Sequence, residues 1–263
     1  SIHEKEANHD LILLFGKNIH DLEKTISKEW DGEIKKNTGD FFGSKKWNCL
    51  EDIFYILNST TNYVVLRNFE ELPNKNPEGN HKDIDILVDE QWHIPFLLNT
   101  TRSEKGGSPY VKIDGEKIFL DIRYVGDIYY DENWSNSILK NRIRTNKGIY
   151  IPNEKDQFYS LLYHCLIHGA GLSNDYLQKI QTLSKKLEIE IDDFSNLSKL
   201  EKILEEFMNK SGYQYTNSIK YRIKHCELVR LVNVAIFVAK HEGLNKLFYA
   251  MKGKIRRKLI SPR

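Results

Sequence analysis

The sequence predicts an α+β fold, in which a small sheet is flanked by helices and followed by a helical C-terminal half. Apolar residues recur at helical spacing before residue 58 and after residue 153, whereas runs that alternate as strands do lie between them. An Asp-Gly turn between two β-rich runs is typical of a hairpin. We therefore expect an N-terminal helical segment over 1–58 that packs on a core over 59–152, and a helical C-terminal domain over 153–263.

Two helices and a strand are expected first. Stretches from Leu11 to Leu22 and from Trp47 to Leu57 each carry an apolar face at helical spacing. The run Tyr63–Arg67 is rich in the aromatic and β-branched residues that strands favour. A long loop from Glu70 to Lys82 then leads to the next strand.

That next strand carries two acids at alternate positions. Alternation sends Asp83 and Asp85 to one face of the strand and Ile84 and Ile86 to the other. Neighbouring carboxylates repel each other and resist desolvation, so the pair is costly without a cation. Mg²⁺ binds through one or two carboxylates together with substrate phosphates. These residues therefore predict a site for Mg²⁺ or Mn²⁺ that handles a phosphate-bearing substrate.

The predicted hairpin supplies a third acid. Its turn is Asp114-Gly115, because this pair tolerates the positive φ angles of a tight two-residue turn. Asp121 lies in the apolar returning strand, although Asp is depleted from strands. If this strand lies beside the one carrying Asp83 and Asp85, the three carboxylates can converge on one metal cluster.

Helices are expected in most of the remaining chain. A short helix separates the acid-bearing strands, and a strand at Gly148–Ile151 closes the core. Asn153 caps the first C-terminal helix, and Gly169 ends it. The predicted helices are Gln91–Leu98, Phe158–His168, Asn174–Leu187, Ser195–Asn209 and Ser218–Lys240.

The three acids resemble the pattern of the nucleotidyltransferase superfamily, the fold shared by DNA polymerase beta and antibiotic nucleotidyltransferases. In that family Asp-x-Asp lies on one strand and a third acid on a later strand, and Asp83, Asp85 and Asp121 match these positions. The resemblance implies a nucleotidyltransferase-type sheet in which the first two acids hold two metal ions. It further implies that the third acid joins them at the ion that activates the attacking hydroxyl, with a nucleoside triphosphate as donor and a small molecule or glycan precursor as acceptor.

The chain departs from this family at the phosphate-binding turn. No Gly-Ser pair precedes Asp83, and Arg67 and Asn68 stand near its usual place. A guanidinium group offers a two-pronged contact to phosphate, so Arg67 is expected to bind the nucleotide with Asn68. Lys82 and Arg123 flank the acids and are the other expected phosphate contacts, with Arg123 projecting to the same side as Asp121.

Composition narrows the class of protein. The 39 Lys and Arg residues barely exceed the 37 Asp and Glu residues, so bulk nucleic-acid binding is not expected. The three cysteines lack metal-ligand or disulfide spacing, which favours a reducing compartment. The sequence lacks a secretory n-region and h-region at its start and an apolar run of about 18 residues. A cytoplasmic location is therefore expected.

The last residues are basic and apolar. No acid follows Glu242, and lysines and arginines accumulate there beside apolar residues. Such a helix can lie on an anionic membrane, which would place the protein peripherally at the inner membrane face and favour a bacterial surface-glycan substrate. The alternative is a solvated helix end whose apolar side chains dock on the body.

Other functions stay open. A phospho-alcohol transferase resembling the LicD type would use the clustered aspartates with a CDP-linked donor to modify a cell-surface polysaccharide. A nucleotide-sugar glycosyltransferase would need an early strand–helix alternation that is missing here. A non-catalytic nucleotide-binding or regulatory module is favoured by the missing Gly-Ser pair, although a dead site has no reason to keep three acids together.

Overall fold

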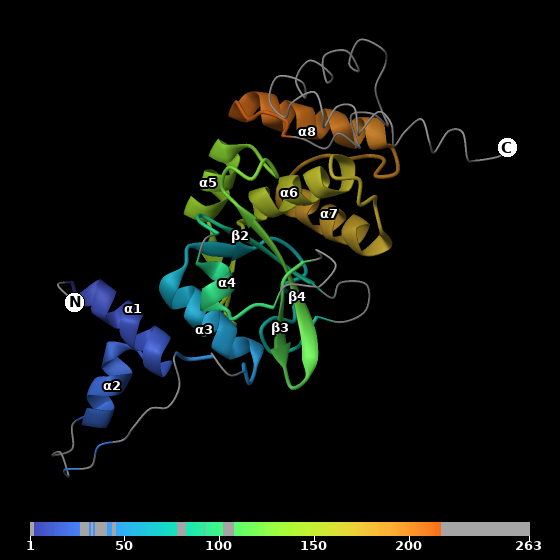
Figure 1. The fold of residues 1–263 in the computed structure, drawn as a ribbon. Coiled ribbons are helices and arrows are strands. Elements are labelled where there is room, and N and C mark those ends of the chain that lie inside the picture. The colour runs from blue at the N-terminus through green and yellow to red at the C-terminus, as the bar shows by residue number, and fades with distance from the viewer. Residues whose placement is uncertain are drawn as a thin grey trace, which may run out of the picture. The chain divides into compact units, whose positions relative to one another are not determined.

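A computed structural model describes residues 3–26, 32, 34, 41–43, 46–77, 83–91, 93–101 and 108–216 (Figure 1). These residues form helices and a small mixed sheet, which confirms the predicted α+β class. The chain divides into two compact units between residues 157 and 158, and each unit is described here by itself. The predicted helix Ser218–Lys240 and the basic segment after Glu242 lie outside the described residues.

The first unit is built on a four-stranded sheet with the strand order β1-β2-β4-β3. The central strands β2 and β4 run parallel, while β1 pairs antiparallel with β2 and β3 pairs antiparallel with β4. The two strands predicted to carry acids are therefore neighbours. The strands are β1 (Tyr63–Val65), β2 (Asp83–Val88), β3 (Tyr110–Ile113) and β4 (Glu116–Tyr124).

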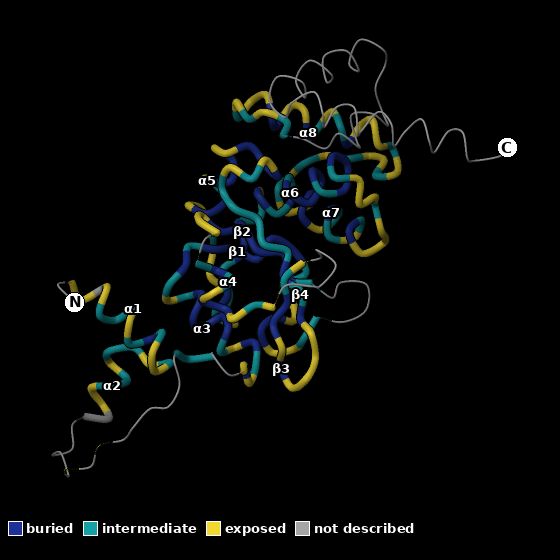
Figure 2. Tube along the Cα trace, in the orientation of Figure 1, coloured by how far each residue is buried: buried dark blue, intermediate teal, exposed yellow. Residues whose placement is uncertain are grey.

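The predicted hairpin is confirmed between β3 and β4. Asp114 has φ 48° and Gly115 has φ 85°, the left-handed backbone that a tight two-residue hairpin turn requires. Figure 2 shows the tip of this hairpin as exposed, whereas β2 is buried along most of its length. The turn thus fixes the register of β4, and with it the position of Asp121.

One face of the sheet forms the hydrophobic core. Ile84 and Ile86 of β2 and Leu120 of β4 are almost fully buried there. They belong to one cluster with apolar residues of the helices α1 (Glu4–Phe15), α3 (Leu50–Thr60) and α4 (Ile94–Leu97). Because side chains alternate along a strand, burial of the even-numbered positions sends the odd-numbered ones to the opposite face.

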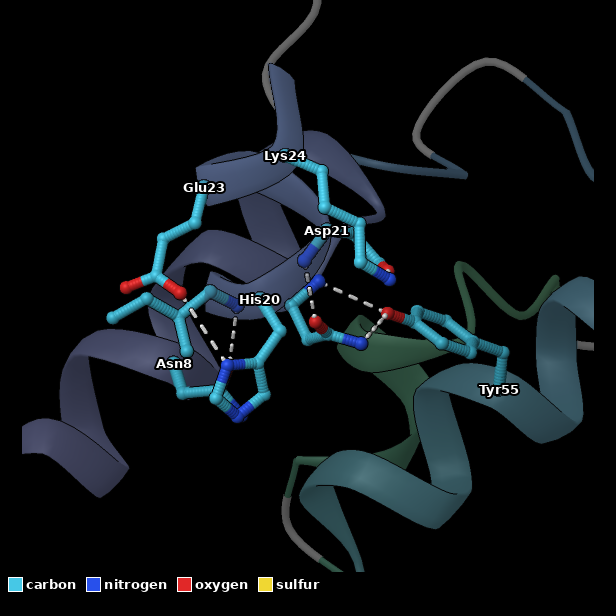
Figure 3. A network of polar contacts seen from close by, with 8 residues as sticks. Asn8, His20, Asp21, Glu23, Lys24 and Tyr55 are labelled. Carbon is cyan, nitrogen blue, oxygen red and sulfur yellow. Dashed lines mark hydrogen bonds and ion pairs between the residues drawn. The ribbon is translucent and has the colours of Figure 1, made fainter. Parts of the chain in front are cut away.

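The N-terminal helices are joined by a polar network (Figure 3). Asn18 caps α2 (Ile19–Ile26), because its side-chain oxygen accepts a hydrogen bond from the backbone N–H of Asp21 at 2.9 Å. The backbone N–H of Asn18 donates to the hydroxyl of Tyr55 on α3 at 3.0 Å, and Asn8 of α1 accepts from Ile19 at 2.8 Å. These contacts hold α2 against α1 and α3.

The single helix expected over Leu11–Leu22 is divided into α1 and α2, because Gly16 ends α1 with a left-handed backbone at φ 64°. Two further elements were not predicted from the sequence. Helix α5 (Glu132–Lys140) packs against β1 and β2, and Asp131 caps it by accepting hydrogen bonds from Asn133 and Trp134. Strand β5 (Ile143–Arg144) pairs with β6 (Tyr150–Ile151), which lies within the strand expected at 148–151. The polar residues of α5 hide its apolar face, which consists mainly of Trp134, Ile138 and Leu139.

The second unit is helical, and the division between the units falls within α6 (Glu154–Leu166). Helices α7 (Asn174–Lys186) and α8 (Leu197–Ser211) follow, close to their predicted bounds. The rings of Tyr159 and Phe207 stack with centroids 3.7 Å apart, and the hydroxyl of Tyr163 donates to the carbonyl of Thr216. In neither unit does a described helix have the length and apolar character needed to cross a membrane.

Candidate functional site

The pairing of β2 with β4 brings the three predicted acids to one face of the sheet. Asp85 is directly opposite Asp121, and Asp83 is opposite Phe119 one step along the same face. Side chains of directly opposed residues on neighbouring strands lie next to each other. The core face is occupied by Ile84 and Ile86, so the acids point to the other face.

Arg67 neutralises the innermost acid. Its guanidinium Nη2 donates to Oδ1 of Asp85, and only 9% of the Arg67 side chain and 4% of the Asp85 side chain are exposed. The backbone ties the two residues together as well, because Leu66 N–H donates to the carbonyl of Asp85 at 2.9 Å. Arg67 was expected to contact phosphate, and its partner in the structure is the carboxylate of Asp85.

Burial dominates the electrostatics of Asp85. It raises the pKa of this carboxyl from 3.8 to about 7, since a charged carboxylate is poorly solvated inside the protein. The positive charge of Arg67 opposes this increase, and the negative charges of Asp83 and Asp121 add to it. Asp85 therefore requires a cation next to it to stay ionised near neutral pH.

Arg123 makes a similar pair on the other flank. Its Nη2 lies 3.0 Å from an oxygen of Asp121, which confirms that both side chains project to the same side. The guanidinium carbon lies 4.3 Å from the centre of the Tyr129 ring, within range of a cation–π contact. This pair is only half-buried, with 35% of the Arg123 side chain exposed and 24% of the Asp121 side chain.

The other two expected phosphate contacts are Asn68 and Lys82, and the structure describes only Asn68. Asn68 has φ 56°, a left-handed conformation that Asn tolerates better than most residues, directly after Arg67. Asn68 lies beyond the end of β1, where the sequence lacks the Gly-Ser pair typical of nucleotidyltransferases. Lys82 lies outside the described residues.

Two residues around the acids were not predicted as part of the site. Asp127 accepts a hydrogen bond from the backbone N–H of Tyr129 at 2.8 Å. Burial raises the pKa of Asp127, while the charge of Arg123 opposes this rise and the charge of Asp121 adds to it. Tyr129 is buried, and burial raises the pKa of its hydroxyl. The charge of Arg67 opposes this rise, and the charge of Asp85 adds to it. Because Tyr129 and its neighbour Tyr130 are both buried, neither offers an exposed ring on which a base or sugar could stack. The signal in the sequence that points to both residues is the run from Arg123 to Asp131, which is rich in aromatic and charged residues.

The carboxylates of Asp83, Asp85 and Asp121 are the candidate ligands for a metal ion. In the part of the chain that the structure describes, no three or more His, Cys, Asp or Glu side chains are arranged so that they could hold one. The guanidinium groups of Arg67 and Arg123 engage oxygens of Asp85 and Asp121. The chemistry of the set still fits a hard divalent cation, because it offers carboxylate oxygens from adjacent strands on one face.

Comparison of the chain with protein-family models, with curated proteins and with solved structures gave no match.

Proposed function

We propose that this protein is a metal-dependent transferase that moves a nucleotidyl group from a nucleoside triphosphate to a small-molecule or glycan-precursor acceptor. The observation that carries the proposal is the register of the sheet, which sets Asp85 beside Asp121 with Asp83 on the same face. Repulsion among three carboxylates is costly unless cations lie among them, and two guanidinium groups offset only part of that charge.

Asp83 and Asp121 would hold the divalent ion, Mg²⁺ or Mn²⁺. Both are less buried than Asp85, so an ion can reach their oxygens from solvent. A bound ion of this kind supplies an activated attacking oxygen and neutralises the charge that develops on the transferred phosphoryl group. The protein's own part is to fix the two carboxylates on neighbouring strands, where hairpin and sheet register leave them little freedom.

Arg123 is the better supported phosphate contact of the two arginines. Its side chain is 35% exposed, and its Nε is a buried donor without a hydrogen-bond partner among the described residues. The ring of Tyr129 holds the guanidinium in place, so its donors can meet a phosphate without first being ordered. Arg67 is committed to a buried carboxylate and faces solvent far less.

A second candidate is the phospho-alcohol transferase of LicD type with a CDP-linked donor. It is favoured by the chain after β1, where Arg67 and Asn68 replace a Gly-Ser turn whose amides would approach a triphosphate. A cytoplasmic enzyme acting on surface-glycan precursors is consistent with either donor.

Calorimetry with Mn²⁺ and a panel of nucleotides tests these alternatives. We expect a nucleoside triphosphate to bind only with Mn²⁺, and Asp83→Asn and Asp121→Asn each to weaken this binding at least about tenfold. Asp114→Asn is the matched control, because it removes the same charge from the exposed hairpin turn, where Asn tolerates a positive φ.

Each other outcome identifies a different function. Binding of CDP-linked alcohols in place of triphosphates would select the second candidate. Metal-independent binding, or equal binding by the control and both site variants, would reject the transferase and leave a non-catalytic module.

A further inference from the structure

The position of Arg67 bears on how many divalent ions the site takes. Its guanidinium contacts Asp85, the acid that the Asp-x-Asp pattern would otherwise assign to two ions. Both partners are more than nine-tenths buried, so the pair belongs to the interior of the first unit. An ion that used Asp85 would have to displace Arg67 from this position.

Such displacement is unfavourable for two reasons. A guanidinium group cannot lose its proton in a protein, so a displaced Arg67 stays charged. Breaking a buried ion pair by removing one partner is strongly destabilising, because a charge is left uncompensated. Movement of the backbone is also restricted, because Leu66, next to Arg67, donates a hydrogen bond to the carbonyl of Asp85 itself.

The other two acids are placed differently. Asp121 keeps 24% of its side chain exposed, and its partner Arg123 keeps 35%, so this pair is in contact with solvent. Asp83 stands at the start of β2, less buried than the residues that follow it. A hard cation can therefore reach Asp83 and Asp121 without removing any buried charge from its partner.

We infer that Arg67 is a permanent cation of this site, which takes the place of one of the two expected metal ions. The site then binds one divalent ion, held by Asp83 and Asp121, while Asp85 serves to hold Arg67. This inference rests on the proposed function, since it concerns how the same acids share their cations.

The number of bound Mn²⁺ ions tests the inference directly. Equilibrium dialysis and electron paramagnetic resonance are applied to the whole chain with a saturating non-hydrolysable nucleoside triphosphate. We expect one ion per chain with the spectrum of an isolated Mn²⁺. Two ions with a spin-coupled spectrum would overturn the inference and leave the proposed function standing, whereas no bound ion would overturn both.

Substitutions separate the role of Arg67 from that of Asp85. Asp85→Asn should still bind one Mn²⁺, with affinity within about threefold, because its amide oxygen can still accept from Arg67. Loss of the ion in this variant would overturn the inference. Arg67→Met should bind a second ion and show spin coupling, since it frees the carboxylate of Asp85.

Arg67→Lys is the matched control, because it keeps the positive charge and should stay at one ion. A single ion in folded Arg67→Met would contradict the role of Arg67. If circular dichroism shows that Arg67→Met does not fold, the number of Mn²⁺ ions bound by the unmodified chain and by Asp85→Asn decides whether the site takes one ion or two.

Discussion

The Arg67–Asp85 pair and the Arg123–Asp121 pair place the same two chemical groups on one sheet face, yet they differ in burial. In the first pair, 9% of the arginine and 4% of the aspartate side chain are exposed. In the second, these fractions are 35% and 24%. The two aspartates are directly opposite each other on β2 and β4, so sheet position alone does not explain the difference.

The depth of burial changes how an ion pair affects pKa, stability and ligand binding. In the buried pair, desolvation is the largest influence on Asp85 and raises its pKa to about 7, even with a guanidinium in contact. The half-buried pair can exchange with water and salt, so it contributes little to stability and remains available to a ligand. The comparison thus assigns the buried pair to structure and the half-buried pair to binding.

Removing the carboxylate from each pair should give the largest contrast. We expect Asp85→Leu to lower the free energy of unfolding by about 3–5 kcal/mol, because it leaves the guanidinium of Arg67 buried and unable to deprotonate. The same change in the other pair, Asp121→Leu, should cost no more than about 1 kcal/mol. Urea unfolding of both variants measures the difference, and equal losses would show that burial does not distinguish the pairs.

The pH dependence of stability should reveal Asp85 separately. Its folded pKa of about 7 lies above the unfolded value of 3.8, so the folded state binds the proton more tightly. The stability from this group is fully present below pH 3.8 and is lost as pH rises toward and through 7. The total loss is at most about 4 kcal/mol, from roughly three pKa units at about 1.4 kcal/mol each.

The measurement compares the intact chain with Asp85→Asn between pH 4 and 8 by urea unfolding. Burial also raises the pKa of Asp127 and of Asp156, so the difference between the two curves is the informative quantity. We expect this difference to fall with rising pH. A flat difference would contradict the assignment of the raised pKa to Asp85.

Much of this sheet face was predictable from the sequence. Alternation along β2 placed Asp83 and Asp85 together, and the Asp114-Gly115 turn fixed the hairpin that carries Asp121. The sequence pattern does not predict that β2 and β4 are neighbours, because strand order depends on packing between distant segments. The α+β class followed from periodicity alone.

The partners of the acids were not predictable in the same way. Arg67 was expected to bind phosphate, because a sequence shows that an arginine is near but not how deeply it is buried. The burial of Tyr129 beneath Arg123 likewise depends on packing that the sequence pattern does not show. Helix α5 was missed, although Asp131 is a recognisable cap, because its polar residues mask the apolar face.

Removing Arg67 should lower the free energy of unfolding less than removing Asp85 does, because the two partners of the buried pair differ in whether they can lose their charge. We expect Arg67→Met to lower the free energy of unfolding by about 1–3 kcal/mol near pH 6, because the remaining carboxyl can take up a proton. Loss of Arg67 raises the pKa of Asp85 further, since the guanidinium normally opposes that rise. The cost should therefore increase above pH 7, by at most about 1.4 kcal/mol per pH unit. Urea unfolding at pH 6 and pH 8 tests this, and a cost independent of pH would contradict it.

The smallest effect concerns the ring that orients the half-buried pair. Arg123 lies 4.3 Å from the centre of the Tyr129 ring, and such contacts are worth about 0.5–1 kcal/mol at partly exposed sites. A double-mutant cycle of Arg123→Met with Tyr129→Leu should give a coupling energy of this size in urea unfolding. Repeating the cycle with Tyr129→Phe, which keeps the ring, should abolish most of that coupling. If both cycles give the same value, the phenol hydroxyl and not the ring face holds Arg123, and the half-buried pair is ordered by hydrogen bonding in the same way as the buried one.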